Sequence, residues 1–169
     1  MLKFKGIKNS RGEIQMDNIY KRTKLTMSQV MLPNQANVAG NVHGGEIMKF
    51  MDSTAGAVGI KYSRGNVVTA RVDELEFHSP IFVGAMVTCT GVIAYVGRTS
   101  MEVAVTVDVE DLESDEPPKR ALSAYFTMVA LDKMGKPKRV PELLIETEEE
   151  KRLFQEGKRR HEFYKRKKR

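Results

Sequence analysis

The clearest constraint on the fold of this chain is a series of long β-type stretches joined by short links. Residues 100–110 (SMEVAVTVDVE) alternate between apolar and polar side chains, the period of a strand with one buried face. Residues 66–77, 85–97 and 120–132 are also predicted to be strands, and residues 24–32 can form a first one. The links HSPIFVG, GRT and DLESDEPPK leave little room for crossover helices, so neighbouring strands are expected to run antiparallel.

One helix interrupts this series of strands, in the stretch that begins with Gly45. At 100° per residue, a single stripe that should face the sheet contains Ile47, Met51, Thr54 and Val58. A second stripe, roughly 120° away, carries an acid and three glycines: Asp52, Gly45, Gly56 and Gly59. Because a glycine inside a helix costs about 1 kcal/mol relative to alanine, we expect another backbone or a ligand to approach this stripe. One helix laid on an antiparallel sheet predicts an α+β layer.

The length and composition of the chain predict one domain with an extension at each end. The chain has 169 residues, of which 41% are hydrophobic and 30% charged, as in a soluble globular protein. Residues 1–22 are predicted to be an N-terminal extension, residues 23–140 the domain, and residues 141–169 a helical extension. Thr147 and Glu150 have the spacing of a capping box at the start of that last helix, and its candidate anchors are Leu153, Phe154 and Tyr164.

Two absences from the sequence predict a cytoplasmic location. No apolar run approaches the roughly 20 residues of a membrane span, and the basic N-terminus is not followed by the apolar stretch of a secretory signal. The single cysteine, Cys89, lies in an alternating apolar stretch, so we expect a buried core residue and no disulfide framework.

Five blocks of sequence, in order, resemble the acyl-CoA thioesterases of the cytosolic acyl-CoA hydrolase type. They are NVAGNVHGGEIMKFMD, VVTARVDELEFHSPIFVG, GRTSMEV, RALSAYFTMVALD and VPELLIETEEEKRLFQEGKRR. The resemblance covers roughly residues 22–160. It implies the hotdog fold, a long central helix wrapped by an antiparallel sheet of about five strands. It also implies hydrolysis of acyl-CoA to a free acid and CoA, by a homo-oligomer that is at least a dimer and commonly a trimer of dimers.

The resemblance also assigns roles to individual residues. Asp52 is expected to be the general base or the nucleophile, Asn37 to orient the water or the carbonyl, and the helix start at Gly45 to hold the oxyanion. The family builds each site across a dimer interface, so the Asp52 of one chain is expected to meet Asn37 and Gly45 of its partner. The expected contacts with CoA and the acyl group are His43, Gly44, Arg98, Thr99 and Ser100. No metal and no cofactor is implied.

Other interpretations of these residues remain open. Asp52 can be a structural carboxylate, Asn37 a turn residue and His43 a residue that shapes the loop. Arg98 can be an ordinary turn arginine instead of a phosphate ligand. At the level of function, the alternatives are a hotdog module that binds acyl-CoA without cleaving it, and a dehydratase, which would need a catalytic histidine that the helix lacks after His43.

The net charge of +6 is concentrated in the last twelve residues. Residues 158–169 hold eight Lys or Arg and one Glu, so the rest of the chain is close to neutral. We interpret this tail as the solvated end of a helix whose last residues are disordered. Binding of a nucleic acid or an anionic membrane is the alternative, and no nucleic-acid partner is expected. A third possibility is that the tail draws anionic CoA towards the site.

Overall fold

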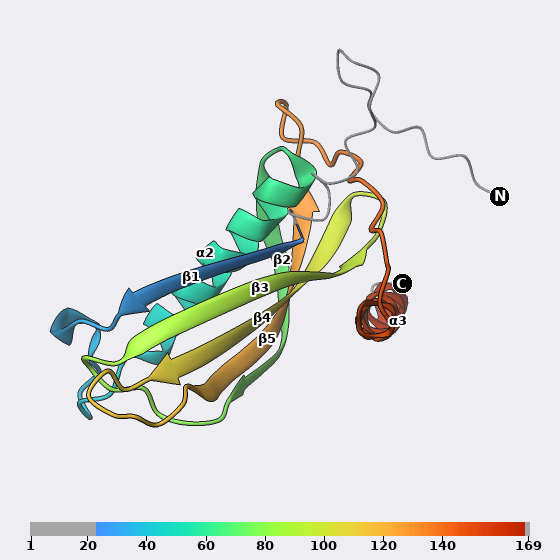
Figure 1. Ribbon diagram of the computed structural model, residues 1–169. Helices are drawn as coiled ribbons and strands as arrows, with labels where there is room; N and C mark the ends of the chain where they lie inside the picture. The colour runs from blue at the N-terminus through green and yellow to red at the C-terminus, as the bar shows by residue number, and fades with distance from the viewer. Residues whose placement is uncertain (1–22, 168–169) are drawn as a thin grey trace, which may run out of the picture.

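A single antiparallel sheet forms the body of the protein (Figure 1). The computed structural model describes residues 23–167; the expected extension over residues 1–22 and the last two residues of the basic tail lie outside this range. The strands lie in the order β1-β3-β4-β5-β2, so β1 and β2 are the two edges. Their bounds are β1 Lys24–Val30, β2 Val67–Phe77, β3 Met86–Val96, β4 Ser100–Glu110 and β5 Lys119–Ala130. The α+β prediction is confirmed, and each predicted strand is present.

The central helix α2 (Gly44–Ser63) packs along one face of this sheet, after a short 3-10 turn, η1 (Pro33–Gln35). Its predicted core stripe is buried: Ile47, Met51, Thr54 and Val58 are each at most 1% exposed. The contact with β3 is close because Gly91 has no side chain, and a Cβ there would lie 2.8 Å from Val58 Cγ2. The helix ends at Arg64, which takes the left-handed conformation and donates its N–H to the carbonyl of Ile60.

Edge strand β2 departs from a regular ladder at two places. Its pairing with β5 shifts between Thr69 and Arg71 and again between Asp73 and Glu76. Each shift inserts one extra residue into β2, which explains why the sequence alternates only loosely there. Glu74 lies in the second irregularity with a φ of 51°, a left-handed value that few residues other than glycine adopt.

The C-terminal helix α3 (Glu148–Lys167) lies on the other face of the sheet from α2 (Figure 1). The predicted capping box is present: Glu150 N–H donates to Thr147 Oγ1 at 3.1 Å, and Thr147 N–H donates to a Glu150 carboxylate oxygen at 3.0 Å. Gly157 is the point of closest approach, because a Cβ there would lie 2.6 Å from Tyr95 Cβ. The Phe154 ring also contacts Tyr95, with ring centroids 5.1 Å apart.

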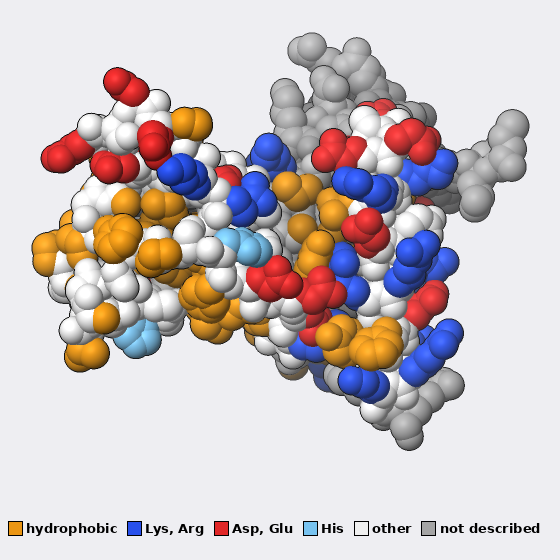
Figure 2. Space-filling model, turned by 90° about the horizontal axis from the view of Figure 1, so that it is seen from below, with side chains coloured by type: hydrophobic (Ala, Val, Ile, Leu, Met, Phe, Trp, Pro, Cys, Tyr) orange, Lys and Arg blue, Asp and Glu red, His pale blue; other side chains and the backbone are white. Residues whose placement is uncertain are grey.

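The solvent side of α3 is strongly basic. Lys and Arg side chains gather along this helix, whereas apolar side chains gather at the end of the molecule where α2 begins (Figure 2). The expectation of a merely solvated helix end is wrong in part, since Arg160 and Tyr164 contact the sheet through Tyr125 and Arg71. Within residues 23–167, neither helix has the length and apolar character needed to cross a bilayer.

Candidate active site

A small cleft opens beside the start of α2. Its volume is about 230 Å³, and its walls come from the loop before the helix, the first turn of the helix and the end of β2. The residues that line it are Asn37, Asn41, Val42, Gly44, Ile47, Phe77, Ser79, Pro80, Ile81 and Leu122. Apolar side chains therefore lie beside the polar Asn37, Asn41 and Ser79, a mixture that suits a ligand with an apolar chain and one polar end.

Asn37 lies at the rim of this cleft with its amide orientation fixed by the backbone. Its Oδ1 accepts hydrogen bonds from the N–H groups of Ala39, at 2.9 Å, and Asn41, at 3.2 Å. The Nδ2 amide of Asn37 has no hydrogen-bond partner within residues 23–167. Asn37 thus shapes the turn with its oxygen and keeps its NH₂ free to donate.

The start of α2 provides a second free donor. His43 caps the helix, because its Nδ1 accepts the Gly45 N–H at 2.9 Å. The Gly45 N–H reaches a substrate only if this bond breaks. The Gly44 N–H, one residue earlier, has no partner in the described part of the chain. Because the helix dipole is positive at this end, Gly44 N–H is well suited to an oxyanion.

Asp52 lies on the exposed side of α2 and does not line the cleft. Its Oδ1 accepts a 2.5 Å hydrogen bond from the hydroxyl of Thr69, which comes from edge strand β2. Thr69 was not among the residues that the sequence singled out. The available signal was the strand period itself, because Thr69 lies two residues after the apolar Val67 and so on the same face of β2.

The glycines beside Asp52 have different surroundings. Gly59 is where Val67 packs, since a Cβ on Gly59 would lie 3.2 Å from a Val67 methyl group. Within residues 23–167, nothing beyond the helix's own backbone lies within 4 Å of a Cβ position on Gly56. At Gly59, the neighbour that we expected to approach the helix is Val67 of the same chain. At Gly56, the approach of a partner chain remains a prediction.

Arg98, Thr99 and Ser100 form the turn between β3 and β4, at the opposite end of the sheet from the cleft. The backbone of this turn is held by the carbonyls of Arg98 and Thr99, which accept the N–H groups of Val140 at 3.2 Å and Ala130 at 3.0 Å. The Arg98 side chain is exposed. Within one chain, the predicted site residues therefore lie in three separate places. One group lines the cleft, Asp52 lies beside Thr69, and Arg98, Thr99 and Ser100 lie at this turn.

Comparison with known proteins gives a consistent result. The model of the thioesterase superfamily matches residues 39–115. The cytosolic acyl coenzyme A thioester hydrolase of Mus musculus is 42% identical over 130 residues, which are 76% of this chain and 34% of the mouse protein. This chain thus spans about a third of the length of that relative. Protein VdlD of Helicobacter pylori is 39% identical over 83% of this chain and 80% of its own length.

Solved structures agree in fold. An apo-hexameric acyl-CoA thioesterase superposes with a TM-score of 0.81 at 35% identity, over 87% of this chain and 94% of that one. The acyl-CoA hydrolase of Staphylococcus aureus, solved with butyryl coenzyme A, coenzyme A and coenzyme A disulfide, gives 0.79 at 30% identity, over 88% and 90%. Structures of its Asn-to-Ala, Asp-to-Ala and Thr-to-Ala variants also match. The hotdog prediction is confirmed, and this chain belongs to the acyl-CoA thioester hydrolases of the thioesterase superfamily.

Proposed function

We propose that this protein hydrolyses the thioester of acyl-CoA to a free carboxylic acid and CoA. The observation that carries the proposal is the pair of free donors at one apolar cleft, the Asn37 amide and the Gly44 N–H. Hydrogen-bond donors that line one cleft can stabilise the negative charge that develops on a thioester oxygen. The membership of the chain in a family of thioester hydrolases supports the same substrate class.

We propose further that Asp52 reaches this cleft from a second copy of the chain. Within one chain Asp52 is exposed and absent from the cleft walls, while β2 beside it is a free sheet edge. A two-fold pairing along that edge would bring the Asp52 of each chain towards the cleft of the other, giving two equivalent sites. Gly56, open on the same helix face, leaves room for such a partner.

The Staphylococcus aureus enzyme supports these assignments by its residue spacing. The Asn, Asp and Thr replaced in its variants are separated by 15 and 17 residues, as are Asn37, Asp52 and Thr69 here. The family resemblance named Asn37 and Asp52, and the spacing adds Thr69, which contacts Asp52 in this structure.

In the reaction, Asp52 would act as a general base. It removes a proton from a water molecule, whose oxygen attacks the carbonyl carbon of the thioester. The resulting oxyanion is held by Asn37 and Gly44 until the C–S bond breaks. The departing CoA thiolate then takes the proton from Asp52. Direct attack by the Asp52 carboxylate, with an anhydride intermediate, is the other route by which the same residue can act.

The Arg98 turn is the proposed handle for CoA. Ser100 pairs with Val129, which pairs with Val68, the neighbour of Thr69. The turn therefore lies on the Asp52 side of the shared site, and the exposed Arg98 guanidinium can pair with a phosphate there. Thr99 and Ser100 would add hydrogen bonds beside it.

The assembly and location follow as proposals from the relatives. Relatives are hexameric, so we propose a trimer of dimers for this chain. The mammalian relatives are named as cytosolic, and we propose a cytoplasmic location here.

The test is thiol release from a panel of acyl-CoAs, short to long, by the wild type and by Asp52→Ala. Loss of a general base predicts a decrease in kcat of about 10²-fold or more. Ser53→Ala is the matched control, because Ser53 is exposed on the same helix and bonds only the Lys49 carbonyl. Binding of acyl-CoA without release of thiol from any member of the panel would instead support a binding module.

A further inference from the structure

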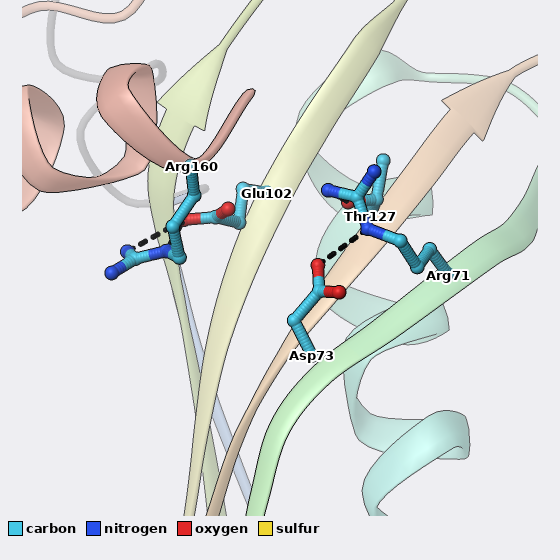
Figure 3. Close-up of polar contacts among 5 residues, drawn as sticks. All are labelled: Arg71, Asp73, Glu102, Thr127 and Arg160. Atoms are coloured by element: carbon cyan, nitrogen blue, oxygen red, sulfur yellow. Dashed lines mark hydrogen bonds and ion pairs between the residues drawn. The ribbon is translucent and has the colours of Figure 1, made fainter. Parts of the chain in front are cut away.

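Helix α3 reaches the strand that carries Thr69. The Tyr164 ring covers the guanidinium of Arg71, whose Cζ lies 3.6 Å from the ring centroid. Arg71 in turn donates to Asp73 at 2.5 Å and to Thr127 Oγ1 at 3.2 Å (Figure 3). Interaction with the Asp73 carboxylate raises the pKa of Tyr164 above its usual value. These contacts tie the last turns of α3 to β2 and β5.

A second contact anchors α3 one strand further into the sheet. Arg160 donates two hydrogen bonds, of 2.8 and 3.1 Å, to Glu102 on β4 (Figure 3). The Arg160 guanidinium also lies 3.5 Å from the centroid of the Tyr125 ring on β5. Because Glu102 is only 3% exposed, the hydrogen bonds between Arg160 and Glu102 are buried under α3. Tyr164, one helical turn later, is thereby held over β2.

The bulge after Thr69 places neighbouring side chains on opposite faces of the sheet. Thr69 pairs with Met128, whose side chain points towards the core, and its hydroxyl faces α2. Arg71 pairs with Thr127, whose side chain lies on the α3 face. Without the extra residue, Thr69 and Arg71 would share a face. Strand β2 can therefore contact α3 through Arg71 on one face while Thr69 contacts Asp52 on the other face.

The contact between α3 and β2 matters because β2 is an edge strand with an interrupted ladder. In a single chain it has hydrogen bonds to β5 on one side only. Between its two irregularities the ladder consists of three pairs, and the first and last belong to Arg71 and Asp73. Tyr164 covers the first of these residues, and Arg71 in turn bonds the second. A guanidinium stacked on an aromatic ring is favourable even at exposed sites, which is significant for so short a ladder.

We propose that Tyr164 is a positioning residue: through Arg71 it fixes the strand segment that presents Thr69. The C-terminal helix, on the face of the sheet opposite the site, then determines how well Asp52 is oriented for attack. The kinetic part of this inference rests on the proposed hydrolysis. The structural part, the anchoring of β2, does not.

The test uses the full chain with three substitutions at the end of α3. Tyr164→Leu removes the ring from Arg71, and we expect kcat to decrease about tenfold with KM little changed, because small misplacements of catalytic groups have large effects on rate. Tyr164→Phe keeps the stacked ring and should retain most of kcat. Phe163→Leu is the matched control: the adjacent ring is 53% exposed, and its ring contacts within residues 23–167 are with Tyr164 and Lys167 on the same helix, so kcat should be unchanged.

A double-mutant cycle with Thr69→Val separates this route from a general loss of stability. If Tyr164 acts through Thr69, Tyr164→Leu should cause no further loss of kcat when Thr69 is already Val. Losses that multiply would overturn the proposal, as would equal losses in Tyr164→Leu and Phe163→Leu.

Hydrogen–deuterium exchange of residues 67–73 provides a readout independent of catalysis. Faster exchange there in Tyr164→Leu, with an unchanged rate in α2, is the expected result; unchanged exchange in β2 would contradict the anchoring. If the wild type cleaves no acyl-CoA, the proposed function fails, and the exchange experiment alone decides whether α3 anchors this strand.

Discussion

The hydroxyl of Thr69 donates a 2.5 Å hydrogen bond to Oδ1 of Asp52, joining edge strand β2 to the exposed side of helix α2. Thr69 thereby occupies one lone pair of the carboxylate and limits the rotation of its side chain. The remaining lone pairs of Asp52 are left to accept a proton from water. A threonine from a different element thus orients the carboxylate that we propose as the base.

This relationship predicts the effect of Thr69→Val, which keeps the shape of the side chain and removes its hydroxyl. A hydrogen bond to a charged group contributes about 1.5–3 kcal/mol, so kcat for acyl-CoA hydrolysis should fall about tenfold or more, with KM nearly unchanged. Thr69→Ser should restore most of the activity because it returns the donor. Equal loss in the Val and Ser variants would show that the hydroxyl is not what matters at this position.

The cleft predicts a steric effect at Gly44. A Cβ on Gly44 would lie 3.1 Å from Phe77 Cε1, on the wall of the cleft. Gly44→Ala should therefore raise KM and lower kcat, because the Phe77 ring must shift towards the space left for the acyl group. Adding Phe77→Leu to Gly44→Ala should recover part of the loss, whereas independent effects of the two changes would contradict this account. Steady-state kinetics on the single and double variants decide the point.

The buried pair under α3 predicts a pH-dependent change in stability. Glu102 is 3% exposed and its charge is matched by Arg160. Arg160→Met leaves that charge unpaired, which should lower the free energy of unfolding by about 3 kcal/mol at neutral pH. Arg159→Met, at the exposed neighbouring position, should change it little.

The sign of the pH effect follows from the pKa of Glu102. Burial raises the pKa of Glu102 above its ordinary value, and the hydrogen bond and charge of Arg160 oppose that rise. In Arg160→Met the rise is larger, so the folded state binds a proton more readily than the unfolded state. The variant should regain stability relative to the wild type as pH falls through the folded-state pKa. Chemical denaturation at several pH values checks this, and a deficit that stays constant with pH would contradict it.

The sequence predicted the elements because their patterns are local. The alternation of residues 100–110 and the stripe through Ile47 and Val58 follow directly from which side chains must be buried, and the structure confirms both. The prediction that Cys89 is buried is also confirmed. Thr147 and Glu150 meet three residues apart, so their capping box needed no tertiary information.

Long-range relationships were beyond the reach of the sequence. Thr69 lies on the face of β2 that faces α2, and nothing in the spacing of Thr69 and Asp52 along the chain reveals their contact. In the sequence, the most visible feature of the basic tail is its charge. In the structure, Arg160 stacks on Tyr125 of β5 and Tyr164 stacks on Arg71 of β2. His43 was expected to shape the loop, and its bond to the Gly45 N–H determines that Gly44 is the free donor.

The central claim is that each site combines Asp52 of one chain with the cleft of another. It is tested most directly by producing Asn37→Ala and Asp52→Ala together in one cell, with distinct tags, and measuring thiol release by the purified mixed oligomer. Each variant alone should be nearly inactive. In a hexamer assembled at random from the two variants, about half of the dimers are mixed, and each mixed dimer holds one intact site of two, so the purified mixed hexamer should recover about a quarter of the wild-type activity per chain. A mixed oligomer no more active than either variant alone would contradict a site shared between two chains.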